Sequence, residues 1–182
     1  MLKKITIVMG MVMAAGVAQA GNGYIGASAA SLKYSDSELN GDANLSMAYV
    51  RLGGYFNDYF SGEVRWGLGF GDETTTVKND PSTKVKVDLE DMLGAYLRGG
   101  FHATDSLYPY AIVGVTRVQT TYLGMGSEQA SDFSYGVGAD WKISDNMSIS
   151  MEYMNYFEKN INYFDTENVK VSGFSVGILG RF

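Results

Sequence analysis

The chain has 182 residues, of which 46% are hydrophobic and 13% aromatic, and it contains 23 glycines, two prolines and no cysteine. This length suits one domain and argues against a multidomain enzyme. The lack of cysteine excludes disulfides and thiolate chemistry, and a single histidine, His102, excludes most zinc sites and most histidine-based triads. A formal charge of −6 argues against nucleic acid as a partner, because phosphates are bound by basic patches.

Residues 1–20 are predicted to be a cleaved secretory signal. Lys3 and Lys4 precede an apolar stretch over 5–18, and Ala18-Gln19-Ala20 is a small-x-small cleavage site. The alternative is a transmembrane anchor, which is disfavoured because the stretch is shorter than the roughly 20 residues of a spanning helix. Cleavage leaves residues 21–182 as one exported domain, which can enter a membrane only by strands.

The rest of the chain alternates with period 2, as strands do, rather than with the 3.6-residue period of helices. Segment 133–143 shows this best, with Phe133, Tyr135, Val137, Ala139, Trp141 and Ile143 on one face and small or charged residues on the other. The phase of segment 108–119 is left open, because both of its faces are apolar. Eight strands are predicted, over 22–34, 47–56, 60–71, 85–101, 108–119, 133–143, 147–157 and 174–182.

The connections also alternate. Short links follow the second, fourth and sixth strands, at 57–59, 102–107 and 144–146, whereas longer polar links follow the others, at 35–44, 72–84, 120–131 and 158–168. Short turns at one end, long loops at the other and an even number of strands are typical of bacterial transmembrane barrels. The predicted fold is an all-β, eight-stranded, antiparallel, up-and-down transmembrane β-barrel with short periplasmic turns and long extracellular loops.

A soluble lipocalin-like barrel is the alternative, and it would place the apolar face inside. Two features favour the membrane. The polar face combines glycines with charges of both signs, as expected of a narrow lumen, and aromatic residues gather at the strand ends, as in the belts at membrane interfaces. Those near the turns are Tyr59, Phe60, Phe101, Tyr108 and Phe182; those near the loops are Tyr34, Phe70, Tyr122, Phe133 and Phe157.

Four passages resemble the transmembrane domain of the outer membrane protein A superfamily. They are Gly53-Gly54-Tyr55-Phe56-Asn57-Asp58-Tyr59, residues 98–107, residues 135–141, and residues 174–182 ending Gly180-Arg181-Phe182. The chain is similar to the small stand-alone barrels of the opacity-protein and outer membrane protein X kind. In that superfamily a C-terminal Phe belongs to the signal that the outer-membrane assembly machinery reads, so the resemblance implies this role for Phe182.

The resemblance also implies a charge cluster in the lumen, either structural or a gate. Glu63, Arg98 and Asp140 match three of its positions, and Ser150 stands where the family has an arginine, which weakens any inference of a gate. Arg65 and Lys142, inward by parity, are expected to balance the acids, and Glu152 shares this face. Because unpaired buried charge is costly, these groups are expected to pair. An eight-stranded barrel is only wide enough for side chains, so a large pore is not expected.

The expected function is non-enzymatic: a Gram-negative outer membrane barrel with a structural or surface-interaction role. A low-conductance channel is the alternative, and a lipid A-modifying enzyme is third, because His102 lies in a short periplasmic turn where such catalytic histidines are not found. No catalytic residue, metal or cofactor is predicted.

Expected partners are outer membrane lipids, lipopolysaccharide, the assembly machinery and ligands at the cell surface, and a monomer is expected. The long links carry an excess of acids that suits basic partners or cations, although their spacing matches no calcium loop: Asp36, Glu38, Asp42, Asp72, Glu73, Asp80, Asp165 and Glu167.

Overall fold

The computed structural model describes residues 22–36, 43–70, 72–77, 80–122, 126–161 and 167–182, with side chains over 22–35, 44–70, 90–119, 131–156 and 170–182. The predicted signal lies outside these residues. Among them, no helix is long and apolar enough to cross a membrane. The strands are β1 (Gly23–Asp36), β2 (Ala43–Tyr55), β3 (Phe60–Phe70), β4 (Asp72–Val77), β5 (Asp80–Gly100), β6 (Leu107–Tyr122), β7 (Gly126–Ser144), β8 (Met147–Ile161) and β9 (Glu167–Arg181).

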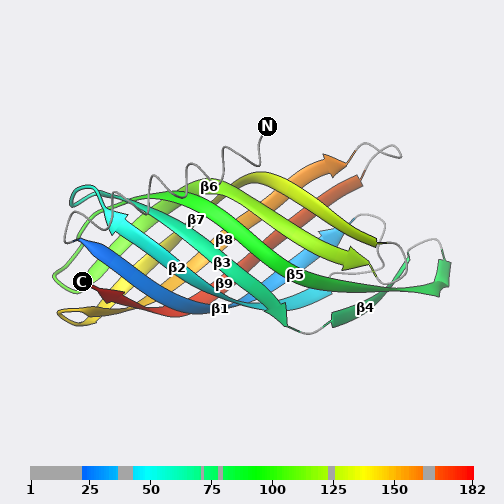
Figure 1. The fold of residues 1–182 in the computed structure, drawn as a ribbon, viewed down its shortest axis with the longest axis horizontal. Helices are drawn as coiled ribbons and strands as arrows, with labels where there is room; N and C mark the ends of the chain where they lie inside the picture. Colours follow the sequence, from blue (N-terminus) through cyan, green and yellow to red (C-terminus); the bar gives the residue numbers. More distant parts are fainter. Residues whose placement is uncertain (1–21, 37–42, 71, 78–79, 123–125, 162–166) are drawn as a thin grey trace.

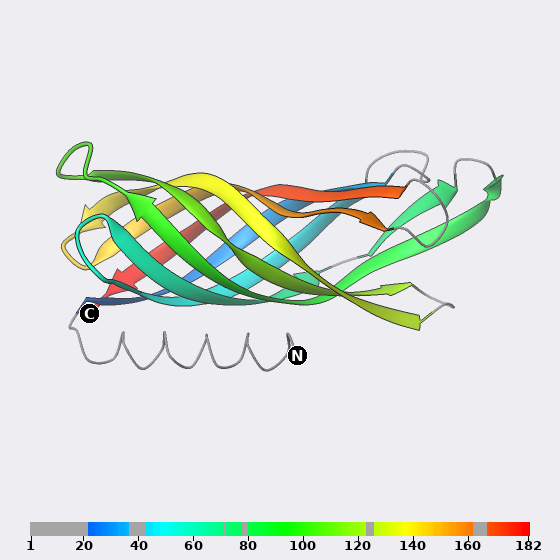
Figure 2. The same cartoon turned by 90° about the horizontal axis from the view of Figure 1, so that it is seen from above.

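Consecutive strands pair antiparallel, except β3 and β4, which do not pair with each other, and the sheet closes on itself. β1 pairs with both β2 and β9, while β5 pairs with β3 along its second half and with β4 along its first half. β3 and β4 are therefore two parts of one staggered strand, and the architecture is the predicted eight-stranded barrel. Closure removes the unpaired edges that an open sheet would expose, and Figures 1 and 2 show the strands tilted around a common axis.

The short connections and the described termini lie at one end of the barrel, here called the turn end. Phe182 and Gly23 exchange backbone hydrogen bonds of 2.9 and 3.1 Å, which tie the last strand to the first. Asn57 Oδ1 accepts the N–H groups of Tyr59 and Phe60, and Thr104 Oγ1 accepts those of Ser106 and Leu107. These side chains fix two turns by the mechanism that makes Asn and Thr frequent there. The opposite end is called the loop end.

On the strands whose side chains are described, most of the exposed large side chains are apolar and face outward. On β7, Val137 is 61% exposed and Trp141 is 58% exposed. Asp140, which lies between them, and Ser134, which precedes them, are buried. On β6, Tyr108, Tyr110 and Ile112 are buried, so the open phase of 108–119 is settled with even-numbered residues inward. A belt of exposed aromatics surrounds the turn end, formed by Phe56, Tyr59, Phe60, Phe101, Trp141 and Phe182.

The loop-end connections are shorter than the sequence indicates. The predicted link 72–84 is mostly a hairpin in which β4 pairs with the start of β5, and Pro81, expected in a loop, is the second residue of β5. β6 and β7 likewise pair as far as Tyr122 and Gly126. Polarity suggested loops here, but a two-stranded ladder continues wherever both partners run on, because its backbone groups satisfy one another. The hairpin of β4 and β5 extends well beyond the barrel wall (Figure 2).

The outward face offers a direct test of membrane insertion. Val137 lies midway along the exposed face of β7 between Phe133 and Trp141, so Val137→Arg places a charge near the bilayer centre and should cost about 2–4 kcal/mol of unfolding free energy. Denaturant unfolding in lipid vesicles measures this cost. Ser131→Arg, on the same face beyond Phe133, is the matched control and should cost little; equal costs at the two positions would contradict the orientation.

Candidate functional site in the barrel lumen

Six charged side chains meet inside the barrel, and all are at most 2% exposed. They are Arg51 on β2, Glu63 and Arg65 on β3, Arg98 on β5, Asp140 on β7 and Glu152 on β8, and they are called the lumen charge cluster. Each occupies an inward position of its strand, so the period of 2 directs all six to the same space. Three guanidinium groups face three carboxylates, and the cluster is formally neutral.

The contacts run across the lumen with alternating sign. Arg98 bonds Asp140 at 2.5 Å on one side and lies 3.6 Å from Glu63 on the other. Arg65 is ion-paired with Glu63 and also contacts Glu152 at 2.7 Å. Arg51 ends the series with a 2.7 Å contact to Glu152. Each carboxylate therefore has a guanidinium partner, which is the condition under which buried charge is tolerated.

Tyrosines complete the coordination of the carboxylates and cover the guanidinium groups. Tyr24 donates its hydroxyl to Glu63 at 2.7 Å, and Tyr110 donates to Glu152 at 2.5 Å. The Arg98 guanidinium carbon lies 3.7 Å from the centre of the Tyr110 ring, and that of Arg65 lies 4.6 Å from the centre of the Tyr96 ring. Such cation–π contacts stabilise desolvated cations, so the tyrosine rings and the carboxylates both stabilise the buried guanidinium groups.

Glycine makes room for this cluster where two strands adjoin. A Cβ atom on Gly138 would lie 2.6 Å from the end of the Tyr110 ring and 2.8 Å from Cγ of Glu152. Neither neighbour can move away without losing its contact to the other, since Tyr110 bonds Glu152. The small residue at this inward position is thus a condition for the buried hydrogen bond beside it.

The structure brings five of the six predicted lumen residues together and separates the sixth. Lys142 lies nearer the turn end, where its side chain is 37% exposed and its ammonium bonds Asp145 at 2.9 Å. The expectation that it balances the buried acids is wrong, because its long side chain reaches solvent and a turn carboxylate instead. Arg51 takes that place and was missed, although the alternation of β2 already points it inward. Ser150 is buried, and its hydroxyl lies 3.1 Å from that of Tyr110.

Above the charges, toward the loop end, the lumen becomes apolar. Met47 and Met92 are at most 2% exposed, and only about 30 Å³ of empty space remains among the side chains of this region. That volume holds about one water molecule. The residues that surround it are called the upper apolar cluster: Leu32, Tyr34, Leu45, Met47, Met92, Val118, Tyr156 and Val171. Over the described residues, the lumen is thus filled by two successive layers of different chemistry.

The remaining candidates lie at the turn end. The His102 ring packs against Tyr108 with 5.0 Å between ring centres, at the side of an open cavity. Within the described part of the chain, no three His, Asp or Glu side chains are grouped as metal ligands. Phe182 is 63% exposed in the turn-end aromatic belt, and its backbone is bonded to β1.

The pairing of the cluster predicts an asymmetry between two charge-neutralising variants. Glu152→Gln removes the carboxylate shared by Arg51 and Arg65 and leaves buried cations uncompensated, so it should cost about 3–5 kcal/mol of unfolding free energy. Lys142→Gln removes only an exposed ion pair and should change stability by less than about 1 kcal/mol. Urea titration in micelles gives both values, and similar small costs would argue against a tightly paired cluster.

Comparison with known proteins agrees with this geometry. Several solved structures share the fold. Neisserial surface protein A is 22% identical with a TM-score of 0.62, and the match covers 90% of this chain and 98% of that one. Ail, the attachment invasion locus protein of Yersinia pestis, is 17% identical with a TM-score of 0.60, covering 89% of this chain and 99% of that one. OprG of Pseudomonas aeruginosa is 13% identical with a TM-score of 0.64, covering 88% of this chain and 96% of that one. A comparison with curated proteins finds no match. The family model of the outer membrane protein beta-barrel domain matches residues 5–182, and the chain therefore belongs to that family.

Proposed function

We propose that this protein is a sealed, non-enzymatic outer membrane barrel that serves as a rigid base for contacts made at the cell surface. The observation that carries the proposal is the filled lumen. Three ion pairs of the lumen charge cluster are 2.5–2.7 Å long, and the upper apolar cluster closes the space above it. A conducting path would have to break buried ion pairs and also wet an apolar layer, and both steps are costly.

The surface role is supported by the form of the loop end. The β4–β5 hairpin extends the barrel wall outward as a paired ladder, which presents a preformed surface rather than a long irregular loop (Figure 1). A protein of similar fold, Ail, is named for attachment and has been solved with a heparin analogue. In this chain the loop-end segments are rich in acids, among them Asp72, Glu73 and Asp80. Because like charges repel, we propose a basic partner rather than a sulfated polyanion.

Phe182 is proposed to take part in assembly. Its side chain is exposed on the lipid side. Its backbone forms two hydrogen bonds with Gly23 at the start of β1, so Phe182 lies where the last strand pairs with the first and the barrel closes. Outer membrane lipids and lipopolysaccharide surround barrels of this kind, and they are the partners proposed for the exposed apolar wall.

A sealed lumen predicts an absence of steady current. In planar bilayers the folded protein should show no stable openings, because both lumen layers are continuous barriers. Stable openings in the wild type whose conductance changes in Glu63→Gln or Arg98→Gln would contradict the sealed barrel and support the low-conductance channel. Insertion is checked in parallel by protection of the barrel from added protease.

The partner chemistry predicts selective adhesion. Vesicles that display the protein should bind polylysine-coated beads, with binding that weakens as salt rises, and should not bind heparin-coated beads. Asp72→Asn, Glu73→Gln and Asp80→Asn together remove three acids of the hairpin and should remove most of the binding, while Asp105→Asn at the turn end should leave it unchanged. Equal binding to both bead types, or binding that survives the neutralisation of these three acids, would overturn the proposal.

A further inference from the structure

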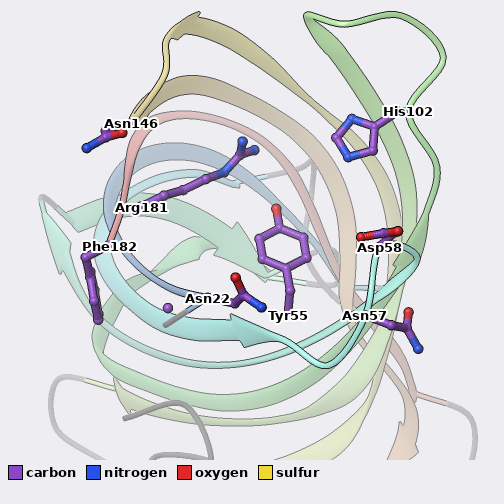
Figure 3. Close-up of a pocket in the computed structure, with 9 residues that line it drawn as sticks. Asn22, Tyr55, Asn57, Asp58, His102, Asn146, Arg181 and Phe182 are labelled. Carbon is purple, nitrogen blue, oxygen red and sulfur yellow. The ribbon is translucent and has the colours of Figure 1, made fainter. Parts of the chain in front are cut away.

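A cavity of about 390 Å³ opens at the turn end, on the side of the barrel that the sealed-lumen function does not use. Its walls come from both described termini and from three turns: Asn22, Gly23, Tyr55, Asn57, Asp58, His102, Asn146, Arg181 and Phe182. Cavities of this size are in the range that holds small ligands. Figure 3 shows Arg181 and Tyr55 projecting toward the middle of the opening, with Asp58 and His102 across from Arg181.

The frame of this cavity is fixed by backbone hydrogen bonds. The Asn22 carbonyl accepts the Tyr55 N–H at 3.1 Å, and the Asn146 carbonyl accepts the Arg181 N–H at 2.8 Å. The floor is closed by rings, since Tyr55 lies 5.4 Å from Tyr24 and 6.0 Å from Tyr108 between ring centres. The cavity is therefore preorganised, which lowers the entropic cost of binding, and it is separated from the lumen charge cluster.

The positive charge of Arg181 has no ion-pair partner in this cavity. Its guanidinium stacks on the Tyr55 ring at 5.7 Å, but no described carboxylate lies within ion-pair distance of it. Arg181 Nε and Tyr55 Oη are both buried and without a hydrogen-bond partner among the described residues. The fully buried guanidinium groups of Arg51, Arg65 and Arg98 each meet a carboxylate, whereas half-buried Arg181 has no ion-pair partner among the described residues. A planar guanidinium and a nearby hydroxyl are donors suited to a ligand carboxylate.

The opposite wall has the complementary charge. Asp58 is exposed in the β2–β3 turn and lines the same cavity, where it can accept from a ligand ammonium. The side-chain oxygen of the neighbouring Asn57 is already engaged in the turn, which holds Asp58 at the rim. One wall thus offers donors and the other an acceptor. We propose that this cavity binds the backbone ends of a short zwitterionic peptide, with its carboxylate at Arg181 and its ammonium at Asp58.

The test uses the folded protein in detergent micelles and three probes. Glycylglycine carries both charges, N-acetylglycylglycine carries only the carboxylate, and ethylamine carries only the ammonium. Nuclear magnetic resonance follows the Arg181 Nε–H and the Tyr55 ring during titration. Both should shift and saturate with glycylglycine, N-acetylglycylglycine should bind at least about fivefold more weakly, and ethylamine should leave the Arg181 Nε–H in place.

Variants separate the two anchors. Arg181→Gln should abolish the shift of the Tyr55 ring, whereas Asp58→Asn should equalise the affinities of the two dipeptides. Lys142→Gln removes a positive charge at the same end without lining the cavity and should change nothing. The proposal is overturned if glycylglycine gives no saturable shift, if the Tyr55 shift survives in Arg181→Gln, or if the acetylated dipeptide binds as well as the free one. Heat-modified gel mobility shows that each variant is folded.

Discussion

Charge neutrality inside a narrow lumen filled by side chains is the constraint on which this barrel depends. Eight strands enclose a lumen only as wide as its side chains, so any charge that points inward must find its counter-charge within that space. The series from Asp140 through Arg98, Glu63, Arg65 and Glu152 to Arg51 meets this condition with contacts from five strands. The cluster therefore also fixes the register of the strands that carry it, because a slip by one residue would turn its members to the lipid.

The two lumen layers divide the work of sealing. The charged layer is specific and stiff, since each guanidinium pairs with a carboxylate and those of Arg65 and Arg98 also contact tyrosine rings. The upper apolar cluster instead fills space with flexible methionines such as Met47 and Met92. The outer wall needs no such specificity, because lipid accepts any apolar side chain. The same period of 2 thus produces an outer surface on which many apolar side chains are accepted and an inner surface on which the side chains must match one another in charge and size.

Most of the fold could be predicted from the alternation of apolar and polar residues, and the parts that could not have physical reasons. Val137 and Asp140 have opposite environments that any reading of period 2 assigns correctly, but Tyr108, Tyr110 and Ile112 are apolar residues that face inward, so polarity alone left β6 undecided. Arg51 was visible on the inward face, yet only closure of the barrel, which places β2 and β8 around one lumen, reveals its partner Glu152. Lys142 had the correct parity, but its height along the barrel decided its pairing. The loop-end hairpins were missed because their polar residues form ladders in water.

The most direct measurement of the central claim is a double-mutant cycle on Arg98 and Asp140, the pair at one end of the series. Arg98→Met or Asp140→Asn alone leaves an unbalanced buried charge, whereas the double variant restores neutrality and leaves the ion pairs of Glu63, Arg65, Glu152 and Arg51 complete. Unfolding free energies in micelles should therefore show the double variant more stable than the sum of the single costs predicts, with a coupling of about 1–3 kcal/mol. Strictly additive costs would contradict the account that paired charge governs this lumen.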